Sequence, residues 1–238
     1  TVLGGYHATF LPCETVNEFP TFDFICAGEG EIAFNELCEK ILKHDKNIYD
    51  IKGMWNINNG IIKDNGRGEI PKTLDELGVP GWHLFDQDIM KRYTTEFPLM
   101  TMRGCTFSCN FCSRPYGQIV RKRTPKLIVD EIENNLNNYN VKYIEFWDET
   151  FTVNKEHTRI ICEEIISRNL TINWRCQTHA NTLNKEIVTL MKRAGCVLAQ
   201  FGVESGNDEI LAKMNKGASK ERIINARNLF KDAGITTC

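Results

Sequence analysis

Residues 99–112 read LMTMRGCTFSCNFC, an apolar run that leads through Arg103 and Gly104 into three closely spaced cysteines. An apolar run that ends at a glycine is typical of a buried strand. Similar runs follow at regular intervals, so strands are predicted at 99–103, 143–147, 172–177 and 197–203, and residues 235–238 open a fifth. Helical periodicity between these runs predicts helices at 125–138, 155–168, 185–194 and 220–233.

Local signals mark the ends of these helices. Residues that commonly cap or begin a helix precede each one, and glycines suited to stop a helix follow two of them. The starts are Thr124 with Pro125, Asn154, Asn184 and Ser219, and the stops are Gly195 and Gly234. Alternating strands and helices predict an α/β fold, a partial parallel (β/α) barrel or open sheet with its chemistry at the C-terminal ends of the strands.

The three cysteines after the first strand, Cys105, Cys109 and Cys112, place three thiolates on one short loop. Iron–sulfur clusters normally take four cysteine ligands, so three leave one iron open to a substrate or cofactor. Zinc is an alternative, but a structural zinc site needs four ligands, and the fourth would have to be a distant cysteine or His179. Inert buried thiols are the third alternative, which we expect for the scattered cysteines elsewhere in the chain.

The spacing CxxxCxΦC, with the aromatic Phe111 before the last cysteine, resembles the signature of the radical S-adenosylmethionine (radical SAM) superfamily. The resemblance implies that Cys105, Cys109 and Cys112 hold a [4Fe-4S] cluster whose open iron chelates the amino and carboxylate groups of S-adenosylmethionine (SAM). It further implies that an electron from the cluster splits the sulfonium to give a 5′-deoxyadenosyl radical. Phe111 is then expected beside the cofactor.

Carboxylates follow two of the later strands. Asp148 and Glu149 come after strand 143–147, where the resemblance implies contact with the ammonium of SAM; a solvated strand end or a helix cap is the alternative. Glu204 and Ser205 follow strand 197–203 in a GVES segment that resembles the family element lining the cofactor's sugar and carboxylate. The alternative for Glu204 is a cap of the next helix. The stretch 211–217 resembles a recurring family helix and turn.

The strand at 172–177 departs from the family pattern. Many relatives have an arginine and an aspartate where this chain has His179 and Asn181. Gln177 and His179 are expected only to line the cavity, because a lone histidine is as often structural as catalytic.

Residues 1–45 are predicted to form a short strand, a Gly-Gly turn, a strand at 22–27 and a helix at about 32–43. With the GEGE stretch at 28–31, they resemble the C-terminal part of a Rossmann-like cobalamin-binding domain, which implies that Gly4 and Gly5 contact cobalamin. A packing surface without cobalamin is the alternative. Residues 46–98 are predicted to be a linker with a small hairpin at 54–57 and 60–63, and residues 99–238 the barrel. Both ends read as cut, so a fragment of a longer protein is expected.

The composition of the chain argues against some classes of binding partner. The chain has 238 residues with 29 basic and 31 acidic side chains, a balance that does not indicate nucleic acid or an anionic membrane, and no apolar run is long enough to span a bilayer. We expect a cytoplasmic, oxygen-sensitive radical SAM enzyme that uses cobalamin for methyl transfer to a small molecule, with ferredoxin or flavodoxin as electron donor. A cyclase or oxidase of a tetrapyrrole is the runner-up. A non-catalytic metal module and an electron-transfer protein with a closed cluster are alternatives of another class.

Overall fold

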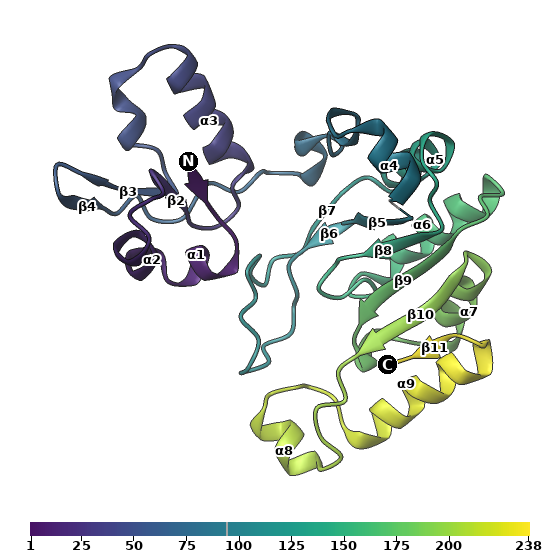
Figure 1. The fold of residues 1–238 in the computed structure, drawn as a ribbon. Helices are drawn as coiled ribbons and strands as arrows, with labels where there is room; N and C mark the ends of the chain where they lie inside the picture. The colour runs from purple at the N-terminus through teal and green to yellow at the C-terminus, as the bar shows by residue number, and fades with distance from the viewer. Residues whose placement is uncertain (94) are drawn as a thin grey trace. The chain divides into compact units, whose positions relative to one another are not determined.

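The structure, a computed structural model, describes residues 1–93 and 95–238, which form two compact units, Thr1–Lys72 and Thr73–Cys238. Each unit has its own sheet (Figure 1). None of the described helices has the length and apolar character needed to cross a lipid bilayer.

The N-terminal unit is built on a four-stranded sheet in the order β1-β2-β3-β4. Its strands are β1 (Val2–Leu3), β2 (Phe24–Cys26), β3 (Met54–Asn58) and β4 (Ile61–Lys63), with β1 parallel to β2 and the other pairs antiparallel. The helices are α1 (Tyr6–Phe10), α2 (Pro12–Glu18), α3 (Glu31–Leu42) and the 3-10 turn η1 (Lys46–Tyr49). The predicted second strand, long helix and hairpin are confirmed.

The hairpin belongs to this sheet, which differs from the expectation of a linker from residue 46. Strand β3 pairs with β2 through Ile25 opposite Trp55 and Cys26 opposite Met54. Buried Met54 and Ile51 then pack in one cluster with residues of β2 and α3. The unit therefore continues to Lys72.

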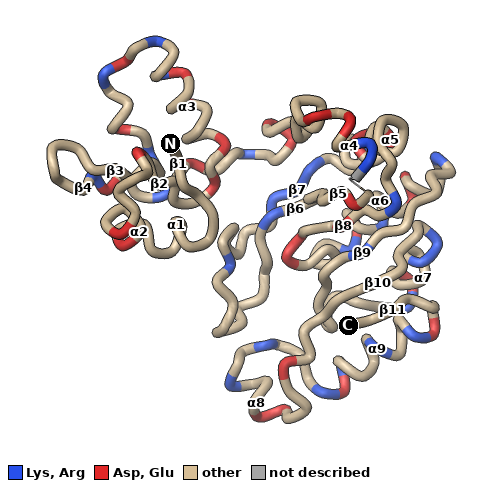
Figure 2. Tube along the Cα trace, viewed as in Figure 1, with Lys and Arg blue, Asp and Glu red and all other residues tan. Residues whose placement is uncertain are grey.

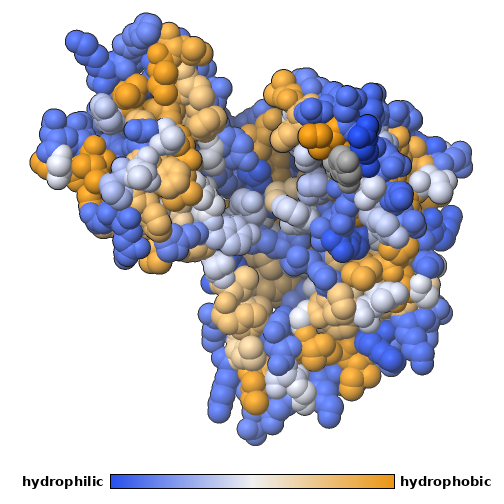
Figure 3. Space-filling model, in the orientation of Figure 1, coloured by the Kyte–Doolittle hydropathy of each residue, from blue (hydrophilic) through white to orange (hydrophobic). Residues whose placement is uncertain are grey.

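Helix α3 leaves apolar side chains uncovered within the described part of its unit. Phe34, Ile41 and Leu42 are 50%, 52% and 80% exposed, and Figure 3 shows orange, hydrophobic atoms over this helix. An open groove of about 720 Å³ runs between α3 and the first two strands.

The second unit contains a five-stranded sheet in the order β11-β10-β9-β8-β5, with every pair parallel (Figure 1). The strands are β5 (Glu96–Leu99), β8 (Tyr143–Phe146), β9 (Asn173–Thr178), β10 (Cys196–Phe201) and β11 (Thr236–Thr237). The helices that connect them are α5 (Pro125–Asn138), α6 (Lys155–Ser167), α7 (Lys185–Arg193) and α9 (Lys220–Ala233). The predicted parallel α/β fold is confirmed, and the sheet of the described residues is open, with β5 and β11 at its edges.

The helices cover one face of this sheet. Side chains alternate between the two faces along each strand, so every second side chain packs against the helices. Ile144, Phe146 and Trp174 are fully buried against them in the main core. The other face carries polar side chains: Arg175 pairs with Glu96 at 2.6 Å and with Glu145 at 3.0 Å, across three neighbouring strands.

Three of the predicted helix caps are confirmed. The side chains of Asn154, Asn184 and Ser219 accept hydrogen bonds from backbone N–H groups in the first turns of α6, α7 and α9. At α5, by contrast, the Thr124 hydroxyl donates to Asp75 at 2.6 Å instead of capping its own helix.

The first predicted strand, 99–103, is divided in the structure. Only β5 joins the sheet, and β6 (Met102–Arg103) forms a separate antiparallel hairpin with β7 (Arg121–Lys122). The remaining elements of this unit are η2 (Leu74–Leu77), η3 (Trp82–Leu84), α4 (Gln87–Tyr93), η4 (Ala180–Thr182) and α8 (Asp208–Lys213).

Candidate functional site at the cysteine loop

The segment that joins β6 to β7, residues 104–120, carries all three predicted cysteines and is called the cysteine loop below. Cys105 is half-buried, Cys109 is buried and Cys112 is exposed. Gly104 begins the loop with φ +99°, and a Cβ there would lie 2.3 Å from the Ile119 carbonyl oxygen. The two ends of the loop can therefore approach each other only with glycine at this position.

A buried carboxylate fixes the segment that leads into the loop. Asp148, at the end of β8, accepts hydrogen bonds on Oδ1 from the backbone N–H groups of Thr101 (2.7 Å) and Met102 (2.8 Å). Its Oδ2 accepts from the Thr101 hydroxyl at 2.6 Å. Burial raises the pKa of Asp148 to about 6, although these hydrogen bonds oppose the rise. The same bonds explain why the strand from residue 99 breaks: its N–H groups at 101 and 102 turn to Asp148.

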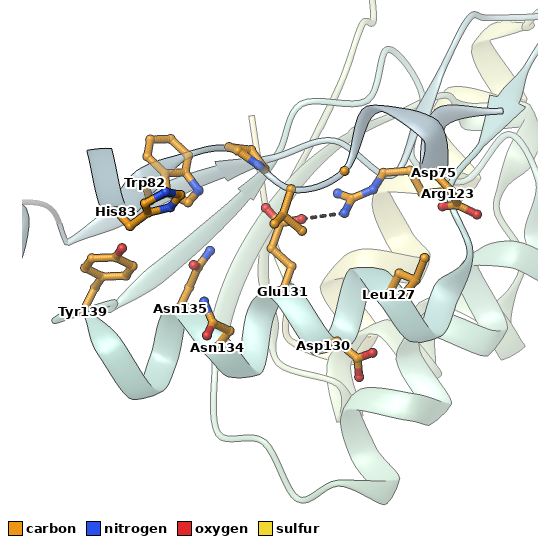
Figure 4. A pocket seen from close by; sticks show the side chains of 13 residues that line it. Asp75, Trp82, His83, Arg123, Leu127, Asp130, Glu131, Asn134, Asn135 and Tyr139 are labelled. Carbon is orange, nitrogen blue, oxygen red and sulfur yellow. Dashed lines mark ion pairs between the residues drawn. The ribbon is translucent and has the colours of Figure 1, made fainter. Parts of the chain in front are cut away.

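A buried ion pair fixes the returning side of the loop. Arg123 follows β7, and its guanidinium lies 2.6 Å from the carboxylate of Glu131 on α5, with both side chains at least 90% buried. Its backbone N–H also donates to the Thr101 carbonyl at 2.9 Å. Figure 4 shows this pair in the wall of a cavity of about 450 Å³, which the segment 75–83 and α5 enclose. Lys and Arg positions gather along the β6–β7 hairpin in Figure 2.

The three thiols lie near one another and near a lysine. The Cys105 Sγ is 3.5 Å from the Thr150 hydroxyl in the segment after β8. Burial raises the pKa of the Cys109 thiol; the Lys216 ammonium opposes that rise, and Cys112 and Cys105 add to it. Burial therefore favours the neutral thiol of Cys109, and a cationic group bound beside it would favour the thiolate.

The carboxylate predicted at the fourth strand meets this lysine. Glu204 has φ +58°, and its Oε1 lies 2.9 Å from the Nζ of Lys216. A Cβ on Gly202 would lie 2.0 Å from the same carboxylate oxygen, so the glycine of the GVES segment leaves the space that the pair occupies. Lys216 also lies over the half-exposed Phe111 ring, 5.6 Å from its centroid. Phe111, Glu204 and Lys216 thus form one side of the site.

Other predicted residues have more local partners. Glu149 is half-buried next to Asp148 in the sequence. Ser205 accepts a hydrogen bond from the backbone of Asn207 at 3.1 Å, and it is Asn207, not Glu204, that caps α8. In the N-terminal unit, Gly4 and Gly5 join β1 to α1.

His179 packs against the loop as a structural histidine. Its ring stacks on Phe107 with centroids 3.7 Å apart, and its Nε2 donates to the Lys216 carbonyl at 3.0 Å. Burial lowers the pKa of His179 to about 4, so the ring is neutral near pH 7. Gln177 is exposed on the sheet face that the helices leave open.

The donor set fits an iron–sulfur cluster. Within residues 1–93 and 95–238, no three His, Cys, Asp or Glu side chains converge on a point that could hold one metal ion. Thiolates that each bind a different iron are spread around a cluster, so three separated thiols on one loop are compatible with it. A parallel α/β sheet with three cysteines on one loop near the carboxyl ends of its strands is the arrangement expected of an iron–sulfur α/β protein.

Comparison with known proteins gives the family. The model of the radical SAM superfamily matches residues 99–238. A protein of Pyrococcus horikoshii named as an uncharacterized methyltransferase is 33% identical over 237 residues, covering 98% of this chain and 51% of that protein. The anaerobic magnesium-protoporphyrin IX monomethyl ester cyclase of Rubrivivax gelatinosus is 30% identical over 256 residues, covering 100% of this chain and 44% of the cyclase.

A solved structure agrees in fold over nearly the whole chain. It is that of OxsB, a cobalamin-dependent S-adenosylmethionine radical enzyme with aqua-cobalamin and S-adenosylmethionine bound. The TM-score is 0.83 at 25% identity, over 99% of this chain and 35% of that one. The chain belongs to the radical SAM superfamily, which confirms the resemblance seen in the cysteine spacing. It spans about half the length of the curated relatives it matches.

Several residues at the site were not predicted from the sequence. Thr150, Lys216 and Asn110 contact the cysteine loop or belong to it, and the sequence around Thr150 and Asn110 does not indicate these contacts. Lys216 lies in the stretch 211–217 that resembled a family turn, which was the one available signal.

Proposed function

We propose that this chain forms the cluster and cofactor site of a cobalamin-dependent radical SAM methyltransferase. The observation that carries the proposal is the loop with Cys105, Cys109 and Cys112 at the carboxyl edge of a parallel sheet, in a chain of the radical SAM superfamily. The three thiolates would hold the [4Fe-4S] cluster, which supplies the electron for cleavage of the sulfonium of SAM.

The protein's own residues would bind and orient SAM. Glu149 and Glu204 would accept hydrogen bonds from its ammonium and its ribose, Phe111 would pack beside it, and Ser205 would shape the turn after Glu204. We assign Asp148 to a supporting role, because its carboxylate is buried and already bonded to Thr101 and Met102. It holds the entry of the cysteine loop instead of contacting the ammonium.

The N-terminal unit supports the cobalamin part of the proposal. Gly5 has φ +94°, and a Cβ built there would meet no atom within 4 Å, so the surface beside Gly5 is open to a bulky ligand; at Gly4 a Cβ would lie in ordinary contact with Cys26, at 3.7 Å. The similar structure of OxsB contains aqua-cobalamin. We propose the same cofactor for the whole protein, a small-molecule substrate, a ferredoxin or flavodoxin as electron donor, and a cytoplasmic location.

The test is anaerobic reconstitution with iron and sulfide, followed by incubation with SAM and a reductant. We expect equal amounts of bound iron and sulfide and release of 5′-deoxyadenosine, and loss of both in the Cys109→Ala variant. Tightly bound zinc without sulfide would instead support a non-catalytic metal module. A cluster whose paramagnetic spectrum does not change when SAM is added would support an electron-transfer protein.

A tetrapyrrole cyclase is the second candidate, favoured by the 30% identity to the Rubrivivax gelatinosus enzyme. The two reactions leave different products of SAM. A methyltransferase also forms S-adenosylhomocysteine, which remains when SAM donates its methyl group, whereas a cyclase forms none. Quantifying both nucleosides after turnover by the whole protein separates the candidates.

A further inference from the structure

The middle of the cysteine loop is bonded to a turn that lies about 100 residues further along the chain. The backbone N–H of Asn110 donates to the Met214 carbonyl at 3.0 Å, and the Asn110 side chain donates to the Lys213 carbonyl at 2.8 Å. In return, the Asn215 side chain donates to the Ser108 carbonyl at 2.9 Å. Three hydrogen bonds therefore surround Cys109, the most buried of the three cysteines.

The turn itself, residues 213–217, has a fixed shape. Asn215 has φ +51°, a left-handed conformation that asparagine tolerates better than most residues. The carbonyls that follow are also bonded: Lys216 accepts from His179 at 3.0 Å, and Gly217 accepts from the side chain of Asn181. The turn at 213–217, which bonds to the cysteine loop, is thus also held by His179 and Asn181 in the segment that follows β9.

We propose that Asn110 and Asn215 are positioning residues that hold Ser108–Asn110, and with it Cys109, in place relative to Cys105 and Cys112 before any cluster binds. The proposal rests on the proposed function for its catalytic meaning, since the geometry of the thiols matters to the reaction only if they hold the cluster. The fixed loop would then set which iron faces Glu204 and Lys216, and so where SAM can bind.

The test compares two asparagines that share a left-handed backbone. Asn215→Gly removes the side-chain hydrogen bond and keeps the conformation. Asn169→Gly is the matched control, because exposed Asn169 has φ +54° after α6 and makes no contact with the loop. In the cluster-free protein, the rate of Cys109 alkylation by iodoacetamide, followed by peptide mass spectrometry, reports how often the loop opens.

We expect Cys109 to react about fivefold faster in Asn215→Gly than in the wild type, the factor typical of one lost neutral hydrogen bond. The control should match the wild type, and the core thiol Cys162 should stay equally slow in all three proteins, which separates loop opening from unfolding. An unchanged Cys109 rate in Asn215→Gly would overturn the proposal. If that variant does not fold, Asn110→Ala, which loses only its side-chain bond to Lys213, is read in the same way.

A second measurement concerns the reconstituted protein. We expect the reduction potential of the cluster, and the change that SAM makes in its paramagnetic spectrum, to differ between Asn215→Gly and the control, which a purely structural loss of stability would not produce. Identical potentials and spectra would refute a positioning role. Failure of the wild type to bind a cluster would reject the proposed function, while the alkylation rates would still decide whether the two asparagines hold the loop.

Discussion

The buried carboxylate of Asp148 should make the stability of the protein depend on pH in a way that one substitution removes. Its side chain is 1% exposed, and burial raises its pKa from the ordinary 3.8 to about 6. The folded state therefore binds a proton more tightly than the unfolded chain. The stabilisation from this proton is complete below about pH 4 and is lost as the pH rises through 6.

The size of the effect follows from the two pKa values. One pKa unit corresponds to about 1.4 kcal/mol, so a change from 3.8 to about 6 corresponds to about 3 kcal/mol of unfolding free energy. Asp148→Asn keeps the shape and the two backbone hydrogen bonds to the side-chain oxygen but cannot ionise. Relative to this variant, the wild type should lose about 2 kcal/mol of this stabilisation between pH 4 and pH 7.

The assay is urea unfolding of the cluster-free, reduced protein, followed by circular dichroism at several pH values. The difference in unfolding free energy between the two proteins cancels the titration of all other groups. A difference that stays constant from pH 4 to pH 7 would refute the buried, raised-pKa carboxylate. So would a difference that changes in the opposite direction, with the wild type gaining stability as the pH rises.

Two further substitutions test the ends of the cysteine loop. Gly104→Ala should destabilise the protein by a few kcal/mol more than Gly117→Ala in thermal or urea unfolding. Both glycines have positive φ, but only at Gly104 would a Cβ meet a backbone atom, at 2.3 Å. Equal losses of stability in the two variants would contradict the close approach. Glu131→Gln should lower the unfolding free energy by about 3–5 kcal/mol, since it leaves the buried guanidinium of Arg123 without its partner charge. A loss below about 1 kcal/mol would show that water solvates the pair.

Local signals were sufficient to predict the four helices that connect the strands of the second sheet. Helices α5 and α9 have the predicted bounds, because Pro125 and Ser219 begin them and Gly234 ends α9 through interactions within a few residues. The short helices α1 and α2 were missed. They have five and seven residues, too few to be stable alone, and are held by burial of residues such as Ala8 and Val16 against β2.

The part of the site whose functional residues lie close together in the sequence could be predicted. The spacing of the cysteines is such a case, and the family comparison agrees with it. The role of Asp148 was not predictable, because its partners Thr101 and Met102 lie 47 and 46 residues earlier in the chain. The pairing of Glu204 with Lys216 likewise depends on how α8 folds back toward the sheet.

The order of events during synthesis follows from where the loop finds its partners. The strands of the second sheet lie side by side in the order in which they are translated, so each can add to its predecessor as the chain emerges. The bonds from Asn110 to Lys213 and from Asn215 to Ser108 span 103 and 107 residues. The cysteines therefore leave the ribosome before the turn that closes around Cys109, so the loop can take its fixed shape only after residues 213–217 have been synthesised.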